Sequence, residues 1–266
     1  MFLSIRAKQV LLFGSYVIAC LVIKAVNADE LKLAVASNFL TPMKSLVNIY
    51  EKETNVKVVI SSASTGKLYT QILHGAPYDL FFAANKREPQ RLEQNGLAIR
   101  GSRTTYAIGK IILWSKKYDI SKLDNLANFF SGTSIKVLAI ANPKTAPYGV
   151  AAMEVLKPYN IPKGSVKIIK GENINQTFQY LASGNADVGF ISMSQLNAVN
   201  HNGYTRKVPL EHYAAIEQQV VLLAKSDNVI QSKRFLQFLQ ENRIQSEIYN
   251  FGYELPRLNN ILSMRQ

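Results

Sequence analysis

Cysteine is almost absent from this chain of 266 residues, and its single cysteine, Cys20, lies near the start. Any product that lacks Cys20 has no disulfide, thiolate nucleophile or cysteine-based metal site. Histidine is scarce too, and the three present (His74, His201 and His212) are too far apart to give a metal-ligand pattern. These shortages exclude the disulfide-rich, zinc-binding and thiol-dependent classes.

Enzyme motifs are also missing. No nucleophile elbow occurs, and no paired carboxylates stand at the expected strand ends. Asp79 and Glu172 are candidate acids, but capping a helix or bridging two elements is the more ordinary role for such residues. The sequence therefore predicts a protein that is not an enzyme and that carries no cofactor.

The first 28 residues have the pattern of a secretory signal peptide. Arg6 and Lys8 precede an apolar run over 10–23, and small residues end the stretch at Val26-Asn27-Ala28. The run is shorter than the roughly 20 residues that cross a bilayer. We expect cleavage after Ala28 and export to the periplasm.

Two other readings of this leader stay open. Residues 17–20 loosely fit a lipobox that would lipidate Cys20, although the apolar run continues beyond it. An uncleaved membrane anchor is the other alternative, and Lys24, close to the run, argues against it.

Charge is unbalanced in the mature chain. The leader holds three of the 31 basic residues and none of the 18 acidic ones, so 28 basic residues remain and the net charge is +10. A nucleic-acid or membrane-surface binder is one reading of this surplus. However, the Lys and Arg residues are scattered, with no run of five or more, which indicates a solvated surface and no nucleic-acid partner. The remaining 238 residues suffice for one large domain or two compact lobes.

Short apolar runs alternate with segments of helical period. The runs predict strands at 31–36, 56–60, 80–84, 111–114, 136–140, 166–169, 188–191 and 218–223. Helices are predicted at 40–52, 68–73, 87–95, 122–130, 149–156, 175–182, 193–197 and 227–249. This alternation predicts an α/β protein whose parallel sheets are wrapped by helices.

Four of the loops that lead from a strand into a helix are rich in hydroxyl and amide residues, at 36–42, 61–68, 141–149 and 170–175. Ligands bind at the carboxyl ends of strands in such folds, and helix starts present free N–H groups and a positive dipole end. The loops therefore predict an anion site. Ordinary helix capping is the alternative for each loop alone.

The second of these loops also contains Gly66-Lys67, which hints at a phosphate loop. Ser61 stands where the first glycine of that motif belongs, and Leu68 stands where Ser or Thr should follow the lysine. A nucleotide site is therefore not expected here.

With these loops in place, the chain resembles the periplasmic molybdate-binding proteins of ABC transporters. The likeness runs in order from Leu31 to about Gly252. Its most specific stretch is Gly75-Ala76-Pro77 followed by Asp79-Leu80-Phe81. The supporting stretches are 35–39, 50–56, 64–68, 71–74, 92–97, 142–143, 146–149, 171–174 and 189–191.

The resemblance implies a two-lobed periplasmic-binding-protein clamp. Each lobe is expected to be a mostly parallel sheet flanked by helices, with two crossovers between the lobes. Lobe 1 would comprise 29–108 and 219–266, and lobe 2 would comprise 109–218. The implied role is the substrate-binding protein of an ABC importer, a monomer that delivers its ligand to a membrane permease.

The resemblance also implies a site built from uncharged donors. These are the hydroxyl and N–H of Ser37 and of Thr65 and the backbone N–H groups of Tyr148 and Ile174, with Asn38 beside Ser37. The ligand would be molybdate or tungstate, with the metal held only as the oxyanion and no direct metal ligands. A clamp for sulfate, phosphate or a phosphonate is the alternative.

One position departs from the family. Some members use a tyrosine hydroxyl where this chain has Ser192, whose side chain is too short for the same reach. We expect Tyr148 or Asn38 to supply the missing donor.

Overall fold

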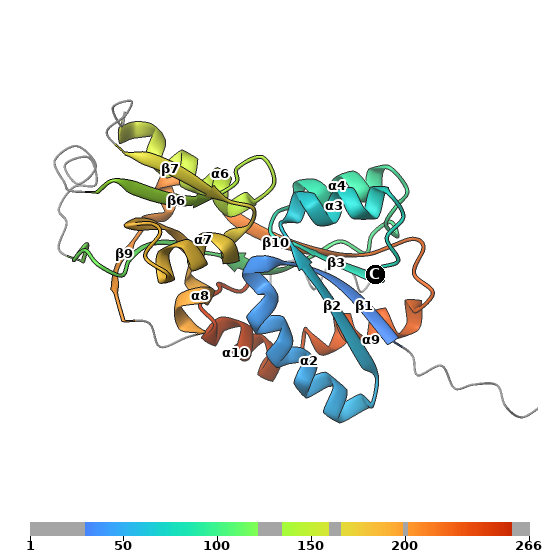
Figure 1. The fold of residues 1–266 in the computed structure, drawn as a ribbon. Coiled ribbons are helices and arrows are strands. Elements are labelled where there is room, and N and C mark those ends of the chain that lie inside the picture. Colours follow the sequence, from blue (N-terminus) through green and yellow to red (C-terminus); the bar gives the residue numbers. More distant parts are fainter. Residues whose placement is uncertain (1–29, 122–134, 160–165, 199–201, 257–266) are drawn as a thin grey trace, which may run out of the picture.

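The computed structural model describes residues 30–121, 135–159, 166–198 and 202–256. The expected leader and the expected helix at 122–130 lie outside these ranges. The described chain forms two five-stranded sheets, one in each of two adjoining lobes (Figure 1). The first sheet has the order β2 (Lys57–Ala63), β1 (Glu30–Ala36), β3 (Leu80–Ala83), β10 (Ile216–Leu222), β4 (Thr104–Gly109). The second has the order β7 (Lys167–Gly171), β6 (Val137–Ala141), β8 (Val188–Ser192), β5 (Ile111–Ser115), β9 (Tyr204–Lys207).

The two sheets have matching strand directions. In the first, β1 is parallel to β2 and β3, and β10 is antiparallel to both β3 and β4. In the second, β6 is parallel to β7 and β8, and β5 is antiparallel to β8 and β9. Each sheet thus has a single reversed strand, which confirms the predicted class of mostly parallel α/β lobes.

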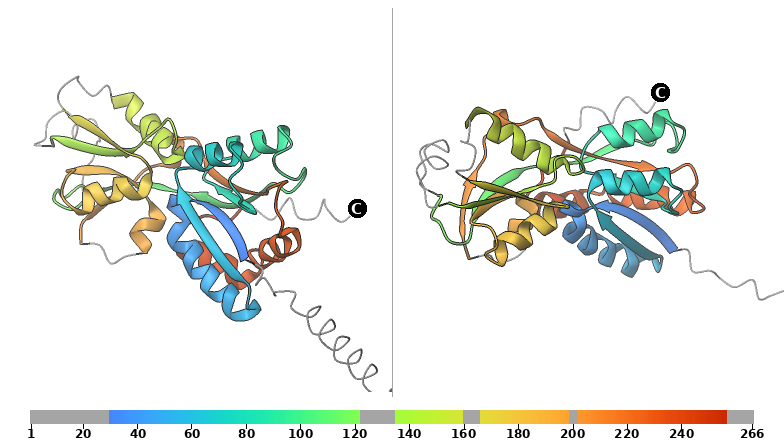
Figure 2. Two further views of the ribbon diagram at one scale, coloured as in Figure 1. Left: turned by 45° about the vertical axis from the view of Figure 1, so that its right-hand side comes forward. Right: turned by 45° about the horizontal axis from the view of Figure 1, so that its top comes forward.

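Helices cover both faces of each sheet (Figures 1 and 2). Those of the first lobe are the 3-10 turn η1 (Ser37–Phe39), α2 (Leu40–Thr54), α3 (Thr65–Leu73), α4 (Arg87–Gln94), α9 (Val229–Phe238) and α10 (Asn242–Asn250). Those of the second are α6 (Pro147–Leu156), the turn η2 (Lys157–Tyr159), α7 (Ile174–Ala182) and α8 (Met193–Asn197), with the turn η3 (Leu210–His212) on the way back.

Burial on both faces explains why the strands are continuous apolar runs. Along β1, Leu31, Leu33 and Val35 join one hydrophobic cluster, whereas Ala34 joins the cluster on the opposite face. Along β3, Leu80 and Phe82 face the first cluster, and Phe81 and Ala83 face the second. Side chains alternate along a strand, so a sheet covered on both sides needs an apolar residue at every position.

The chain passes between the sheets twice. It leaves the first sheet at Gly109 and enters the second at Ile111, and it returns from β9 to β10 at Ile216, which pairs with Gly109. The lobe boundaries expected from the sequence, 108/109 and 218/219, fall inside β4 and β10. We therefore propose that the crossovers are Lys110 and the segment 208–215.

The structure differs from the predicted elements in two ways: two strands were missed, and some elements have other bounds. β4 and β9 were not predicted, β2 continues to Ala63 into the hydroxyl-rich loop, and the expected helix at 227–249 is two helices, α9 and α10. β9 (Tyr204–Lys207) pairs only with β5 at the sheet edge and has no buried residue, so it lacks an apolar signal. In the described part of the chain, no helix has both the length and the apolar character required to traverse a bilayer.

Candidate anion-binding site

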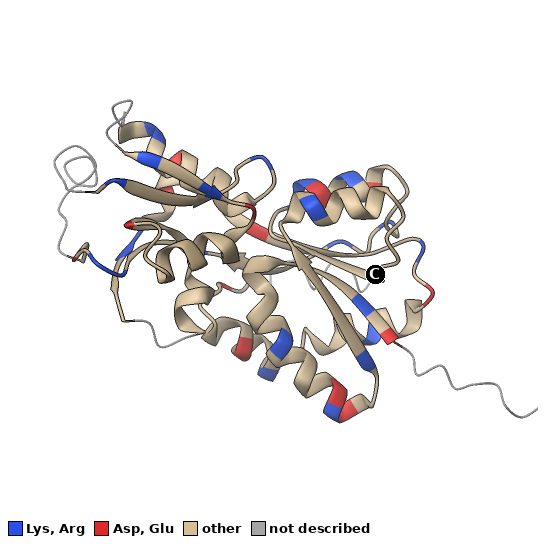
Figure 3. Ribbon diagram, viewed as in Figure 1, with Lys and Arg blue, Asp and Glu red and all other residues tan. Residues whose placement is uncertain are grey.

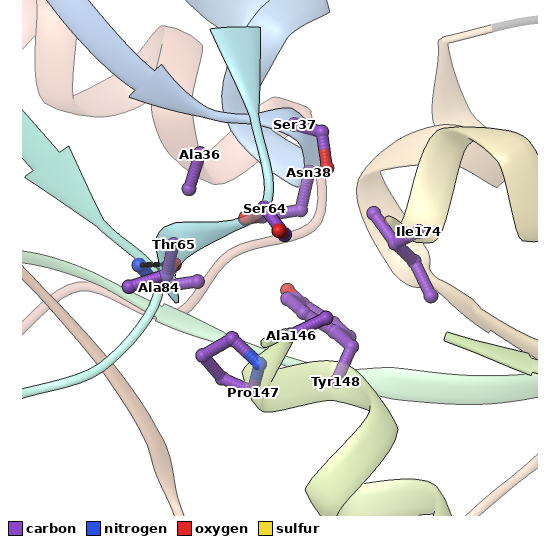
Figure 4. A pocket seen from close by; sticks show the side chains of 10 residues that line it. All are labelled: Ala36, Ser37, Asn38, Ser64, Thr65, Ala84, Ala146, Pro147, Tyr148 and Ile174. Atoms are coloured by element: carbon purple, nitrogen blue, oxygen red, sulfur yellow. Dashed lines mark hydrogen bonds between the residues drawn. The ribbon is translucent and has the colours of Figure 1, made fainter. Parts of the chain in front are cut away.

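One pocket collects all five residues expected at the site. Ser37, Asn38 and Thr65 come from the first lobe, and Tyr148 and Ile174 come from the second (Figure 4). The rest of the lining is Ala36, Ser64, Ala84, Ala146 and Pro147, so no lining side chain is charged. The empty volume, including the mouth, is about 190 Å³. The pocket thus lies between the lobes and is small, neutral and lined by hydroxyl, amide and apolar groups.

The polar lining lies at four helix starts. Ser37 and Thr65 are the first residues of η1 and α3, and Ile174 is the first residue of α7. Pro147 opens α6 and has no N–H, so Tyr148 bears the first N–H of that helix. The first N–H groups of a helix have no partner within it, and together they form its positive dipole end.

No side-chain cap engages the N–H groups of the four residues that line the pocket at these helix starts. No side chain caps η1, α3 or α6. At α7, the Oδ1 atom of Asn173 accepts from the N–H groups of Asn175 and Gln176, each at 3.0 Å. This cap does not use the N–H of Ile174, which is the donor that borders the pocket.

The Thr65 hydroxyl is oriented by a backbone contact. Its Oγ1 accepts a hydrogen bond from the N–H of Ala84 at 3.0 Å, and the residue is only 1% exposed (Figure 4). Because the N–H occupies an acceptor site on the oxygen, the hydroxyl proton is directed to a different neighbour. Thr65 is therefore set to act as a donor toward the pocket.

The side chain of Asn38 is held by other groups of the protein. Its Nδ2 donates to Oε1 of Gln218 at 2.7 Å and to the Tyr253 hydroxyl at 3.0 Å, which uses both amide hydrogens. Its backbone carbonyl accepts from Ser194 Oγ at 3.0 Å and from the Tyr253 hydroxyl at 2.9 Å. The Asn38 side chain thus fixes the loop between β1 and α2 and has no N–H left for a ligand.

Tyr148 is the better candidate for an extra hydroxyl donor. Its ring hydroxyl is buried, has no hydrogen-bond partner within the described residues, and points to the side of the pocket where Ser64 and Asn38 lie (Figure 4). Burial raises the pKa of Tyr148 well above its ordinary value, and the nearby hydroxyls of Tyr253, Tyr106 and Tyr213 add to this. The phenol therefore stays protonated.

Ser192 lies outside the pocket lining. It is the N-cap residue of α8, completely buried, and its Oγ is 3.0 Å from Oγ of Ser194. Ser192 therefore contributes to a helix start, and its hydroxyl does not replace the family tyrosine.

Ser64 is a pocket residue that the sequence analysis did not single out. It precedes α3 directly, is 4% exposed, and its side chain lies on the pocket wall (Figure 4). Its place as the last residue before a helix was the available signal. Ala84 gave no such signal, because its side chain is apolar; it lines the pocket, and its N–H donates to the Thr65 hydroxyl oxygen.

Charged groups lie at the mouth instead. Lys67 of the first lobe and Glu172 of the second form an ion pair at 3.7 Å, with side chains 57% and 70% exposed. Beside them, the N–H of Gly66 donates to the carbonyl of Thr145 at 2.9 Å across the lobe boundary. The described residues include no group of three or more His, Cys, Asp or Glu that could hold a metal ion.

Two α/β lobes that hold a small polar pocket between helix starts define a solute-binding clamp. Residues 31–254 match the family described as bacterial extracellular solute-binding protein, and the chain belongs to this family.

Two proteins that are similar to this chain are both named molybdate-binding protein ModA. The chain is 36% identical over 94% of its length to the molybdate-binding protein ModA of Azotobacter vinelandii, and it covers 98% of that protein. The ModA of Rhodobacter capsulatus is 35% identical, over 85% of this chain and 88% of that one. The solved periplasmic molybdate-binding protein of Azotobacter vinelandii superposes with a TM-score of 0.78 at 35% identity, over 85% of this chain and all of that one. These matches confirm the resemblance noted in the sequence.

Proposed function

We propose that this chain is exported, captures molybdate or tungstate between its two lobes, and delivers the anion to the membrane permease of an ABC importer. The observation that carries the proposal is the convergence of four helix starts, from both lobes, on one uncharged pocket. The two relatives named as molybdate-binding proteins support the choice of anion.

The chemistry suits a doubly charged oxyanion. A dianion moved out of water must have its lone pairs filled, because a buried charge without partners is very costly. Amide and hydroxyl donors at helix starts fill them, and hydrogen bonds to a charged acceptor are roughly twice as strong as neutral ones. A neutral pocket also lets the anion leave, because no lysine or arginine holds it.

Selectivity follows from size and proton count. A smaller anion would leave some of the donors stretched beyond hydrogen-bonding distance. A protonated anion such as hydrogen phosphate would face a lining without a carboxylate to accept its proton. Molybdate and tungstate have the same charge and nearly the same size, so we expect both to bind.

Calorimetry on residues 29–266 tests the proposal. We expect one molybdate or one tungstate per chain, with sulfate and phosphate much weaker, and the anion recovered unchanged. At a hundred times its dissociation constant, a ligand that binds only the folded state adds about 2.7 kcal/mol of stability, which a melting shift reports. Stronger binding of sulfate or phosphate would reassign the clamp to that anion, and no heat with any of the four would refute the proposal.

A further inference from the structure

A second hollow lies on the outside of the second lobe, between α6 and β7. We call it the α6–β7 groove; its apolar lining residues are Pro143, Val150, Met153, Leu156 and Ile168. The empty volume up to its rim is about 920 Å³. Val150, Met153 and Ile168 are 43%, 42% and 37% exposed. The groove therefore offers a small apolar hollow that an apolar side chain of another molecule would fill.

The rim of the groove is basic. Lys157 lines the groove, Lys144 follows Pro143 in the loop before α6, and Lys170 lies on the same face of β7 as Ile168. All three are exposed, and none of them forms an ion pair within the described ranges. Figure 3 shows basic positions along β7 and at both ends of α6. The one acidic lining residue, Glu154, accepts a hydrogen bond from the N–H of Ala214 at 2.8 Å. The groove thus combines an apolar floor with unpaired positive charge.

The groove and the anion site use the same loop, between β6 and α6, and the same helix, α6. Pro143 belongs to the loop between β6 and α6, which also contains Thr145, whose carbonyl binds Gly66 of the other lobe. Val150 lies on α6 two residues after Tyr148, whose N–H faces the pocket. A partner seated in the groove would therefore contact the same loop and helix that hold the anion and close the lobes.

We propose that the α6–β7 groove is the docking surface for an extracytoplasmic segment of the membrane permease, one that carries an apolar side chain between acidic residues. The inference rests on the proposed function. Opposite charge is required because three lysines placed against like charge would be repelled, and charge complementarity also speeds association. A second copy of this chain fits poorly, because it would bring its own positive charge to the interface.

Two substitutions test the groove directly. Met153→Glu places a charge on its floor, and Lys157→Glu reverses a charge on its rim. In cells of the producing bacterium in which the variant replaces the parent chain, we expect molybdate uptake at limiting concentration to fall by ~10-fold or more. Purified variants should bind molybdate like the parent by calorimetry. Ile230→Glu is the matched control, since Ile230 is 69% exposed on α9 of the other lobe; it should leave uptake unchanged.

A photoreactive amino acid at Val150 identifies the occupant. We expect it to crosslink to a membrane-spanning permease polypeptide, identified by mass spectrometry. Crosslinking only to a second copy, or unchanged uptake in both variants, would overturn the inference, as would a loss of molybdate binding in Met153→Glu. Failure of the proposed function is a separate result, because there the parent chain itself would not bind molybdate.

Discussion

At the scale of single residues, one hydroxyl group of the pocket has an acceptor site occupied by the protein. This hydroxyl belongs to Thr65, because the Ala84 N–H engages its oxygen and leaves its proton for the ligand. We expect Thr65→Ala to weaken molybdate binding by ~10- to 100-fold, which corresponds to the loss of one hydrogen bond to a charged group. Thr65→Ser keeps the hydroxyl and should bind within a few-fold of the parent. Equal affinities of the two variants in calorimetry would contradict this role.

Asn38 and Tyr148 both border the pocket, but their side chains should respond differently to truncation. Tyr148→Phe removes a buried hydroxyl without a protein partner, so affinity should fall by ~10-fold while the melting temperature hardly changes. Asn38→Ala removes buried hydrogen bonds to Gln218 Oε1, which keeps only the Tyr106 hydroxyl as a donor, and to the Tyr253 hydroxyl, so it should lower the melting temperature.

The pH dependence provides a check on Tyr148. Its folded-state pKa is raised well above the ordinary value of about 10, so the donor form is complete below pH 10 and is lost only at higher pH. The affinity ratio of parent to Tyr148→Phe should therefore be constant between about pH 7 and pH 9. A ratio that falls within this range would mean that the hydroxyl ionises there.

At the scale of secondary structure, we expect the first N–H of each helix to be the group that binds the anion. In α7, a proline substitution removes this N–H without disturbing the helix. Proline suits the first position of a helix, and Asn173 before it has φ −150° and ψ 175°, which is the extended backbone that precedes proline readily. Ile174→Pro should therefore keep α7 folded, as circular dichroism would show, and weaken anion binding by ~10-fold or more.

Controls separate the lost N–H from the lost side chain. Ile174 is 2% exposed, so part of any effect of proline comes from packing. Ile174→Ala removes more of the side chain and keeps the N–H, and we expect it to lower the melting temperature more than the affinity. If alanine weakens binding as much as proline does, the backbone donor is not the important group.

The pattern of each element also explains which parts of the fold and of the site could be predicted from the sequence. Buried strands such as β1 and β3 are apolar at nearly every position, and the hydroxyl-rich loops precede real helices, so these elements and the neighbourhood of Ser37 and Thr65 could be predicted. The polar edge strand β9 has no such pattern. The network that holds Asn38 joins it to residues 180 and 215 positions away, Gln218 and Tyr253, and no local pattern indicates such pairs.

At the scale of the whole molecule, closure brings the backbones of the two lobes close together. At the mouth, Gly66 N–H donates to the Thr145 carbonyl, and a Cβ atom at Gly66 would lie 3.1 Å from the Thr145 Cα and 3.2 Å from its oxygen. At a second contact between the lobes, the Tyr253 hydroxyl lies 2.9 Å from Oγ of Ser194. This contact joins the C-terminal segment of lobe 1 to α8 of lobe 2. The structure thus corresponds to a clamp whose halves are in contact.

Gly66→Ala tests this closure. The added methyl group should hold the lobes a few tenths of an ångström apart, which stretches the donors of Tyr148 and Ile174 away from an anion held by Ser37 and Thr65. Alanine also favours the helical backbone over glycine by up to ~1 kcal/mol. We therefore expect ~10-fold weaker molybdate binding, with no loss of stability in the unliganded chain. This opposite response of affinity and stability distinguishes a closure defect from misfolding.

Lys67→Ala is the matched control for Gly66→Ala at the same mouth. The Lys67–Glu172 pair is exposed, so it is worth about 0–1 kcal/mol and is screened by salt. Its removal should weaken binding by less than about five-fold at low salt and hardly at all near 0.5 M salt. The effect of Gly66→Ala is steric and should persist at both ionic strengths. If both variants lose their effect in high salt, the lobes are held by charge at the mouth and not by the approach of Gly66 to Thr145.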